Sequence, residues 1–205
     1  MIDRIIFDLS EVYIRGLPGI ESTISERTGI PEKKVFRHLR GPRYNHLIRL
    51  FKAEMTEDQY WRMVRKEGAY KPPISWFKQT VRENFTEIPG TRAIIEQLKE
   101  RYPLALLSDH CREWIENIEE RYPITELFDR IFYSFNTGHT KSERRCFDHV
   151  LVSLNANPET TLYIDDLAQN LALGRKAGIA YTHQFTTAEK LEEELRKLRV
   201  LRTNP

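Results

Sequence analysis

The sequence predicts an α/β fold: a Rossmann-like three-layer core with a parallel sheet, plus an inserted α-helical cap. After residue 84, short apolar runs that end on polar residues alternate with helical patterns. This alternation is typical of a parallel sheet covered by helices on both faces. Between the first apolar run and residue 84 the alternation is missing, and the spacing is that of several helices. We therefore divide the chain into an α/β core, 1–16 and 86–205, and a helical cap, 17–85.

The individual elements follow from the spacing of apolar residues. Short apolar runs predict strands at 4–8, 102–108, 128–134, 161–166 and 179–185. Apolar residues three and four positions apart predict helices over 91–100, 112–121, 144–154, 168–177 and 187–198. Inside the cap, glycine and proline predict breaks between helices at 29–31, 41–42 and 71–73.

Length and composition indicate one folding unit in a reducing compartment. The 205 residues can bury one substantial core, and the net charge of +2 gives no argument for nucleic acid or a membrane surface. Two cysteines are too few for a disulfide framework in a chain of this length. No stretch approaches the roughly 18 apolar residues that span a bilayer. We expect a cytoplasmic protein without a membrane partner.

Polar residues follow four of the expected strands, at the edge where parallel sheets bind ligands. In chain order they are Asp8, Ser108, Asp109, Lys141, Asp165 and Asp166. Taken singly, an acid or serine in such a position is often a helix cap or turn residue. Together they suit phosphoryl transfer, because they supply a carboxylate nucleophile, a hydroxyl donor, a cation for phosphate oxygens and acids for a magnesium ion.

Four segments in this order resemble the motifs of the haloacid dehalogenase-like (HAD) superfamily. They are IIFDLSEV at 5–12, LLSD at 106–109, GHTK at 138–141 with a later aromatic residue, Phe147, and YIDDLAQN at 163–170. The resemblance covers nearly the whole chain and is to the helical-cap branch, similar to small sugar-phosphate phosphatases. It implies a hydrolase that uses Mg²⁺ as its cofactor and acts on a small phosphorylated metabolite.

The resemblance also implies roles for individual residues. Asp8 would attack phosphorus and form an aspartyl-phosphate, while Ser108 would hydrogen-bond a phosphoryl oxygen. Lys141 would offset negative charge on both the aspartate and the phosphoryl group. Asp109, which closes the second motif, is a further expected substrate contact.

The implied magnesium site combines three carboxylates and one backbone carbonyl. Asp166 matches a direct ligand beside Asp8, Asp165 is the neighbouring acid, and the carbonyl of Ser10 completes the protein ligands; magnesium suits such oxygen donors. The acid pair at 165–166 argues against dehalogenation, whose fourth motif is metal-free and carries small polar residues instead of these acids.

Ser10 departs from the phosphatase pattern, in which a second aspartate follows the nucleophile by two residues. Serine cannot act as a general acid or base near neutrality, and loss of such a group typically lowers the rate by about 100- to 10,000-fold. Two hypotheses follow: an active phosphatase, or a catalytically impaired HAD-like protein that binds phosphate and metal. Glu11 is expected to be a surface or cap-contact residue, because neighbouring residues on a strand point to opposite sides.

The segment 33–53 of the cap carries seven lysine and arginine residues, two histidines and no acid. Two interpretations stay open: it faces the catalytic cleft and attracts an anionic substrate, or it is a solvated exterior paired with the acids of 54–67. Arg15, and Arg43 with Tyr44, are candidate substrate contacts. Nucleic acid is not an expected partner, because only this charge run points to it, and the oligomeric state is not predicted.

Overall fold

The computed structural model of the protein describes residues 1–201, apart from the side chain of Tyr44. Its strands are β1 (Arg4–Phe7), β2 (Leu104–Ser108), β3 (Arg130–Tyr133), β4 (Thr161–Asp165) and β5 (Tyr181–Gln184). They form one parallel sheet in the order β3-β2-β1-β4-β5, with the first strand at its centre. The predicted parallel sheet is confirmed, although each strand is shorter than the apolar run that predicted it.

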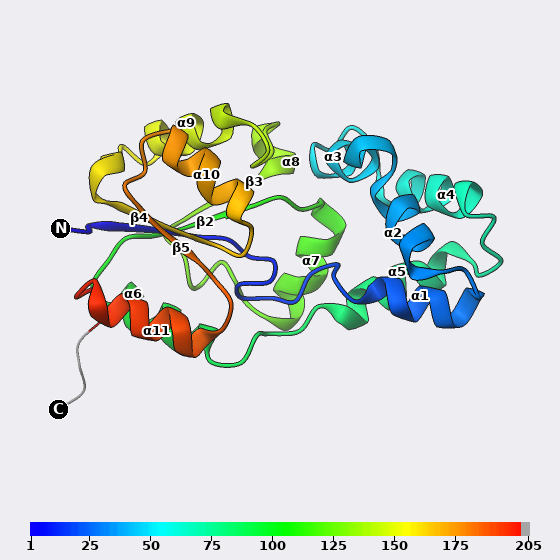
Figure 1. Cartoon of the computed structure of the whole chain (residues 1–205), viewed down its shortest axis with the longest axis horizontal. Helices are drawn as coiled ribbons and strands as arrows, with labels where there is room; N and C mark the ends of the chain where they lie inside the picture. The colour runs from blue at the N-terminus through cyan, green and yellow to red at the C-terminus, as the bar shows by residue number, and fades with distance from the viewer. Residues whose placement is uncertain (202–205) are drawn as a thin grey trace.

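Helices cover both faces of the sheet, which confirms the three-layer core (Figure 1). One face lies under α9 (Arg144–Ser153) and α10 (Ala168–Lys176), and the other under α6 (Thr91–Lys99), α7 (Arg112–Arg121) and α11 (Ala188–Lys197). Side chains alternate between the two faces along each strand. In β1, Ile6 therefore packs on the side of α9 and α10, whereas Phe7 packs on the side of α6, α7 and α11.

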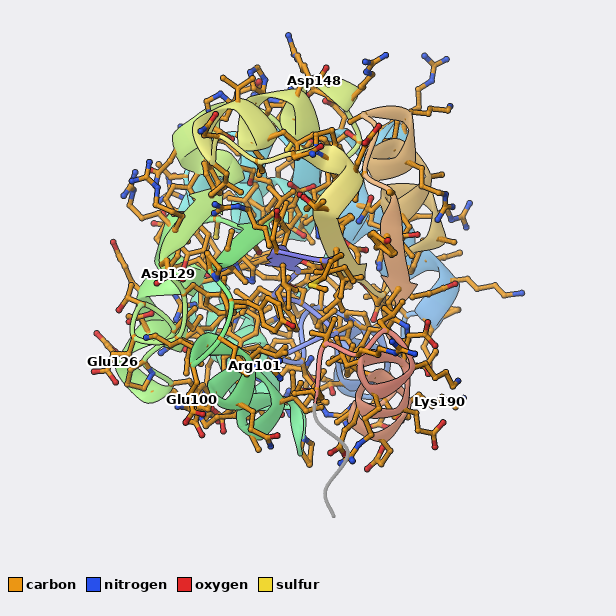
Figure 2. The ribbon with its side chains drawn as sticks, turned by 90° about the vertical axis from the view of Figure 1, so that its left-hand side faces the viewer. Glu100, Arg101, Glu126, Asp129, Asp148 and Lys190 are labelled. Carbon is orange, nitrogen blue, oxygen red and sulfur yellow. The ribbon has the colours of Figure 1, made fainter. Side chains whose placement is uncertain are left out.

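The third strand is shorter than predicted, and a short helix follows it directly. Asp129, labelled in Figure 2, lies outside β3. Its carboxylate accepts a 2.7 Å hydrogen bond from the amide of Leu104 at the start of β2. After β3 the chain turns into α8 (Ser134–Thr137), which ends at Gly138 with φ 73°. The 3₁₀ helix η2 (Pro158–Thr160) precedes β4. The predicted strand at 128–134 was therefore too long at both ends.

All remaining helices lie between β1 and α6. They are α1 (Ile20–Thr28), α2 (Glu32–Arg40), η1 (Pro42–Tyr44), α3 (Asn45–Phe51), α4 (Glu57–Glu67) and α5 (Ile74–Asn84). Figure 1 shows them grouped beyond the end of β1. The start of α4 has a capping box, in which Thr56 and Gln59 each accept a hydrogen bond from the other's backbone amide. No helix in the described residues could cross a membrane.

A buried carboxylate, that of Glu57 in α4, joins these helices to α7. Only 1% of Glu57 is exposed, and its Oε1 accepts hydrogen bonds from the indoles of Trp114 (2.8 Å) and Trp61 (3.2 Å). The guanidinium of Arg82 in α5 binds both oxygens, at 2.8 and 2.7 Å. Burial alone raises the pKa of Glu57, but these hydrogen bonds and the charge of Arg82 outweigh it and hold the pKa below 4.5.

The Glu57→Gln variant is expected to lower the free energy of unfolding at pH 7 by about 3 kcal/mol, because Arg82 loses its anionic partner in a buried site. Since the folded pKa is depressed, this difference is fully present above about pH 4.5 and shrinks as the pH falls below that value. Urea denaturation over pH 3 to 8 measures it.

The matched control is Glu116→Gln on α7, where the side chain is exposed. Its free energy of unfolding should stay within about 0.5 kcal/mol of the wild type. Equal losses for the two variants, or a Glu57→Gln effect that does not change with pH, would show that the buried charge contributes nothing specific.

Candidate active site

The carboxyl ends of the central strands bring three charged residues into direct contact. Nζ of Lys141 lies 2.6 Å from Oδ1 of Asp8 and 2.9 Å from Oδ2 of Asp165. Asp8 directly follows β1, and the register pairs Phe7 with Ile164, so Asp8 and Asp165 sit side by side. All three residues are at most 3% exposed. Side chains far apart in the sequence thus form one buried ion cluster.

Asp165 is held by its own strand and by the following helix. It accepts hydrogen bonds from the hydroxyl of Tyr163, from the amide of Leu167 at 2.8 Å and from Nδ2 of Asn170 at 3.0 Å. Neither Tyr163 nor Asn170 was predicted as a site residue, although both lie in the fourth motif. The sequence did contain a signal for Asn170, because its amide side chain follows the acid pair at 165–166 by about one helical turn. These bonds fix the carboxylate that orients Lys141.

The backbone of Lys141 is anchored by Asp109. Both carboxylate oxygens of Asp109 lie 3.0 Å from the amide nitrogen of Lys141, which donates to them. Burial raises the pKa of Asp109 to about 6, although the charge and the backbone amide of Lys141 oppose the shift. The carboxylate predicted to contact substrate therefore holds the loop that presents the lysine.

Asp8, Asp165 and Asp166 each offer a carboxylate oxygen, and these three atoms lie within 4.8 Å of one another. Burial raises the pKa of Asp8 well above its usual range; Lys141 opposes this shift, and the two other carboxylates add to it. Burial and the charge of Asp165 likewise raise the pKa of Asp166 to about 6. One ammonium faces three acids, so the cluster lacks positive charge and could hold a divalent cation.

Ser108 adds an unused hydrogen-bonding group beside this cluster. It is the last residue of β2, it is fully buried, and its Oγ has no hydrogen-bond partner among the described residues. A buried hydroxyl without a partner costs about 1–3 kcal/mol. An oxygen-rich ligand at the strand ends would supply the missing acceptor.

The loop after Asp8 is a tight turn and not an extension of the strand. Its first carbonyl, that of Leu9, accepts hydrogen bonds from the amides of Tyr13 and Ile14, each at 2.9 Å. Glu11 is half-exposed, adopts φ 57°, and accepts a 2.7 Å hydrogen bond from the amide of Gly16. The prediction for Glu11 assumed that this residue lies on a strand. That assumption was wrong, because Glu11 lies in a turn and binds the loop backbone.

Ser10 lies inside that turn. A Cβ placed on Gly16 would lie 3.2 Å from Oγ of Ser10 and 3.6 Å from Oε1 of Glu11, so both oxygens border the same small space. The position two residues after Asp8 therefore presents a hydroxyl close to the carboxylate of Glu11.

The structure does not bring the two predicted arginines into this cluster. Arg15 is exposed, and its backbone amide donates to the carbonyl of Thr86 at 2.8 Å. Arg43 is also exposed and lines a cavity whose described lining comes only from residues 29–68. The side chain of Tyr44 is outside the described part of the chain. Substrate contacts by Arg15 and Arg43 stay predictions.

Solved structures with the same fold come from several bacteria. A HAD family enzyme from Bacteroides thetaiotaomicron, in complex with magnesium and inorganic phosphate, is 17% identical over 96% of this chain and 100% of its own, with a TM-score of 0.79. A predicted HAD-like family hydrolase from Porphyromonas gingivalis is 18% identical over 98% and 100%, with a TM-score of 0.77. L-2-haloacid dehalogenase from Xanthobacter autotrophicus, with chloropropionic acid covalently bound, is 15% identical over 98% and 85%, with a TM-score of 0.62.

At these identities the structural similarity establishes the fold alone. The family follows from the sequence, because a model of the haloacid dehalogenase-like hydrolases matches residues 2–183. That match spans all four motif segments and confirms the resemblance. The protein belongs to the haloacid dehalogenase-like hydrolase family.

Proposed function

We propose that this hydrolase is a magnesium-dependent phosphatase that acts on a small phosphorylated metabolite through an aspartyl-phosphate on Asp8. The observation that carries the proposal is the ion cluster, in which Asp8 contacts Lys141 and lies within metal-binding distance of two further acids. The similar enzyme from Bacteroides thetaiotaomicron, whose structure contains magnesium and inorganic phosphate, supports it.

In this mechanism the residues at the strand ends share the work between attack, charge stabilisation and metal binding. A carboxylate oxygen of Asp8 attacks phosphorus while the bond to the leaving oxygen breaks, and water then hydrolyses the acyl phosphate. Lys141 stabilises the added negative charge, and the hydroxyl of Ser108 donates to a phosphoryl oxygen. Mg²⁺, held by Asp8, Asp166 and the carbonyl of Ser10 with Asp165 adjacent, would supply positive charge to the phosphoryl oxygens.

The acid pair favours this reaction over dehalogenation, although a dehalogenase shares the fold. Asp165 and Asp166 converge on Asp8, and together the three carry more negative charge than Lys141 offsets. Such a cluster suits a cation and a phosphate. It adds nothing to the displacement of a halide from a small organic acid, which needs no metal ion.

The second candidate function is a catalytically impaired protein that binds phosphate and metal without turnover. Ser10 is the observation that favours it, because a serine cannot protonate the leaving oxygen or activate water. The ion cluster and the unpaired Ser108 hydroxyl would serve binding equally well. The two candidates differ only in whether bound phosphate ester is cleaved.

We further propose that residues 17–85 act as a cap over the strand ends and limit access to small substrates. Two contacts support this. Nζ of Lys52, directly after α3, contacts the carboxylate of Glu143, two residues after Lys141. The ring of Phe51 lies 6.2 Å from that of His110, which follows the second motif. The inserted helices thus touch both loops that flank the ion cluster.

The Asp8→Asn variant should lose at least about 1,000-fold in metal-dependent phosphate release, because an amide cannot act as the nucleophile. A screen of phosphate esters with Mg²⁺ or EDTA measures this. The matched control is Asp148→Asn on the outer face of α9, which should keep wild-type activity (Figure 2). Wild-type release no greater than that of Asp8→Asn on every substrate would exclude the phosphatase.

The Ser10→Asp variant should raise kcat by about 100-fold or more, because it adds the missing general acid and base. The nearby carboxylate of Glu11 would favour protonation of the new acid, as leaving-group departure requires. Ser10→Ala is the control and should leave kcat unchanged. Magnesium-dependent phosphate binding with no turnover in the wild type or in Ser10→Asp would favour the binding protein.

Reversing one charge of the Lys52 and Glu143 pair should lower kcat/KM by about fivefold, the effect of losing roughly 1 kcal/mol. Lys52→Glu combined with Glu143→Lys should recover most of it, because the pair is restored with opposite polarity. Arg49→Glu is the control, since its partner Glu54 is 3.9 Å away and both side chains are solvated. A double variant with a lower kcat/KM than either single variant would count against a role of this contact in closing the cap.

A further inference from the structure

The inserted helices carry a cavity of about 920 Å³ that is separate from the ion cluster. Its described lining comes from the 29–31 turn, from α2, from the 41–43 turn and from the end of α4 at 67–68. No strand end and no residue of the four motifs contributes to that lining. We propose that this cavity is a second binding site, which takes a small molecule that carries several phosphate groups and an apolar ring, such as a nucleoside triphosphate.

The cavity is strongly basic. Four cations line it, namely Lys34, Arg37, Arg40 and Arg43. Arg40 is neutralised by Glu21 at 2.8 Å, whereas the three others have no carboxylate partner among the described residues. The one lining acid, Glu67, is itself bound by Nε2 of His46 at 2.8 Å. Unpaired cations around a concave surface concentrate an anionic ligand.

The backbone assembles these cations from two elements. On α2, residues three positions apart share a face, which places Lys34, Arg37 and Arg40 together. The chain then reverses at Gly41, where φ is 70° and a Cβ would lie 2.3 Å from the ring of His46. Arg43 itself adopts φ 51°, a conformation that costs a non-glycine residue about 1 kcal/mol or more. Strain of this kind is common at ligand sites.

An apolar wall accompanies the charges. Phe36 is 39% exposed, and the guanidinium of Arg40 lies 3.5 Å from the centre of its ring. Ile30, Pro31 and Pro42 also line the cavity. A flat ligand ring can stack on this aromatic and guanidinium surface while its phosphates meet the unpaired cations. The volume lies in the range of small-molecule sites, which favours a nucleotide over a long polymer.

Isothermal titration of the full-length protein with a non-hydrolysable imido analogue of ATP, in EDTA, tests the proposal. Lys34→Glu and Arg37→Glu should each weaken binding by at least about tenfold. The matched control is Lys33→Glu, on the same helix but outside the cavity lining, which should change the affinity by less than about twofold. Thermal unfolding of each variant checks whether these surface substitutions leave the fold intact.

The proposal would be overturned if the analogue did not bind at millimolar concentration, or if Lys33→Glu and Lys34→Glu weakened binding equally. Loss of binding in Asp8→Asn would also overturn it, because the ligand would then lie at the ion cluster. The analogue should also bind at least tenfold tighter than inorganic tripolyphosphate or adenosine. Equal binding of tripolyphosphate would remove the ring from the proposal, and tighter binding of a ten-nucleotide single-stranded RNA would replace it with nucleic acid. Asp8→Asn keeps this test independent of the phosphatase proposal.

Discussion

The structure depends most on the contact of one buried ammonium, that of Lys141, with two carboxylates. An isolated charge in such a site would cost several kcal/mol, so burial of Lys141 requires both Asp8 and Asp165. The parallel register of β1 and β4 places those acids side by side. Asp109 completes the arrangement, because it fixes the backbone of the lysine from a third strand end. The strand order therefore brings the acids together, and the acids in turn allow Lys141 to be buried.

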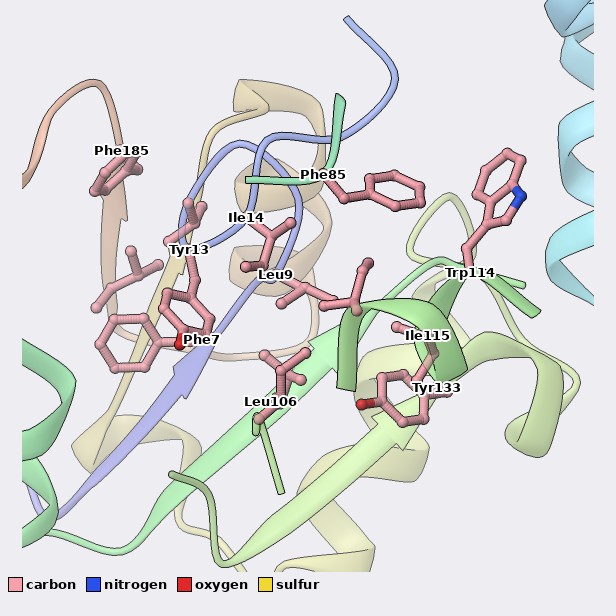
Figure 3. Close-up of a cluster of buried hydrophobic side chains, with 14 of the residues drawn as sticks. Phe7, Leu9, Tyr13, Ile14, Phe85, Leu106, Trp114, Ile115, Tyr133 and Phe185 are labelled. Atoms are coloured by element: carbon pink, nitrogen blue, oxygen red, sulfur yellow. The ribbon is translucent and has the colours of Figure 1, made fainter. Parts of the chain in front are cut away.

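A second buried charge, that of Glu57, connects the inserted helices to the core beside this sheet edge. Glu57 receives hydrogen bonds from α4, α5 and α7, so one carboxylate joins the insertion to the helix that follows the second motif. Aromatic rings surround the junction, with Phe51, Tyr60 and Phe85 within 6.3 Å of Trp114 (centroid distances). Figure 3 shows Phe85 and Trp114 at the edge of the same apolar cluster that contains Phe7 and Leu106. Packing thus continues from the sheet into the insertion.

The site has buried polar and charged groups but lacks an acid at the position of Ser10. Asp8, Ser108, Lys141 and Asp165 are buried at the strand ends, whereas Ser10 stands where the proposed phosphatase reaction would need an acid. Glu11 does not simply replace it, because its carboxylate is engaged by the amide of Gly16. Under the proposed function, the site would therefore hold a phosphoryl group better than it would release one, which is why turnover and binding are the two functions to separate.

The basic segment of the insertion shows how far sequence reasoning reached. It left two interpretations open, a face toward the catalytic cleft or a solvated exterior. The structure supports neither in full, because Lys34, Arg37 and Arg43 line a hollow of the insertion itself. Gly41 and Arg43, which both have positive φ, lie in the turn that lines that hollow. Neither could be foreseen from helical periodicity.

The sequence by itself determined the alternation of strands and helices, the order of the strand-end residues and the family, because apolar spacing and motif order are local properties of the chain. Only the tertiary structure decided which atoms meet. It directs Asp109 to the Lys141 backbone, supplies Tyr163 and Asn170 to Asp165, and makes a turn of the residues around Glu11. These outcomes depend on strand register and backbone dihedral angles, which arise from packing between segments distant in sequence.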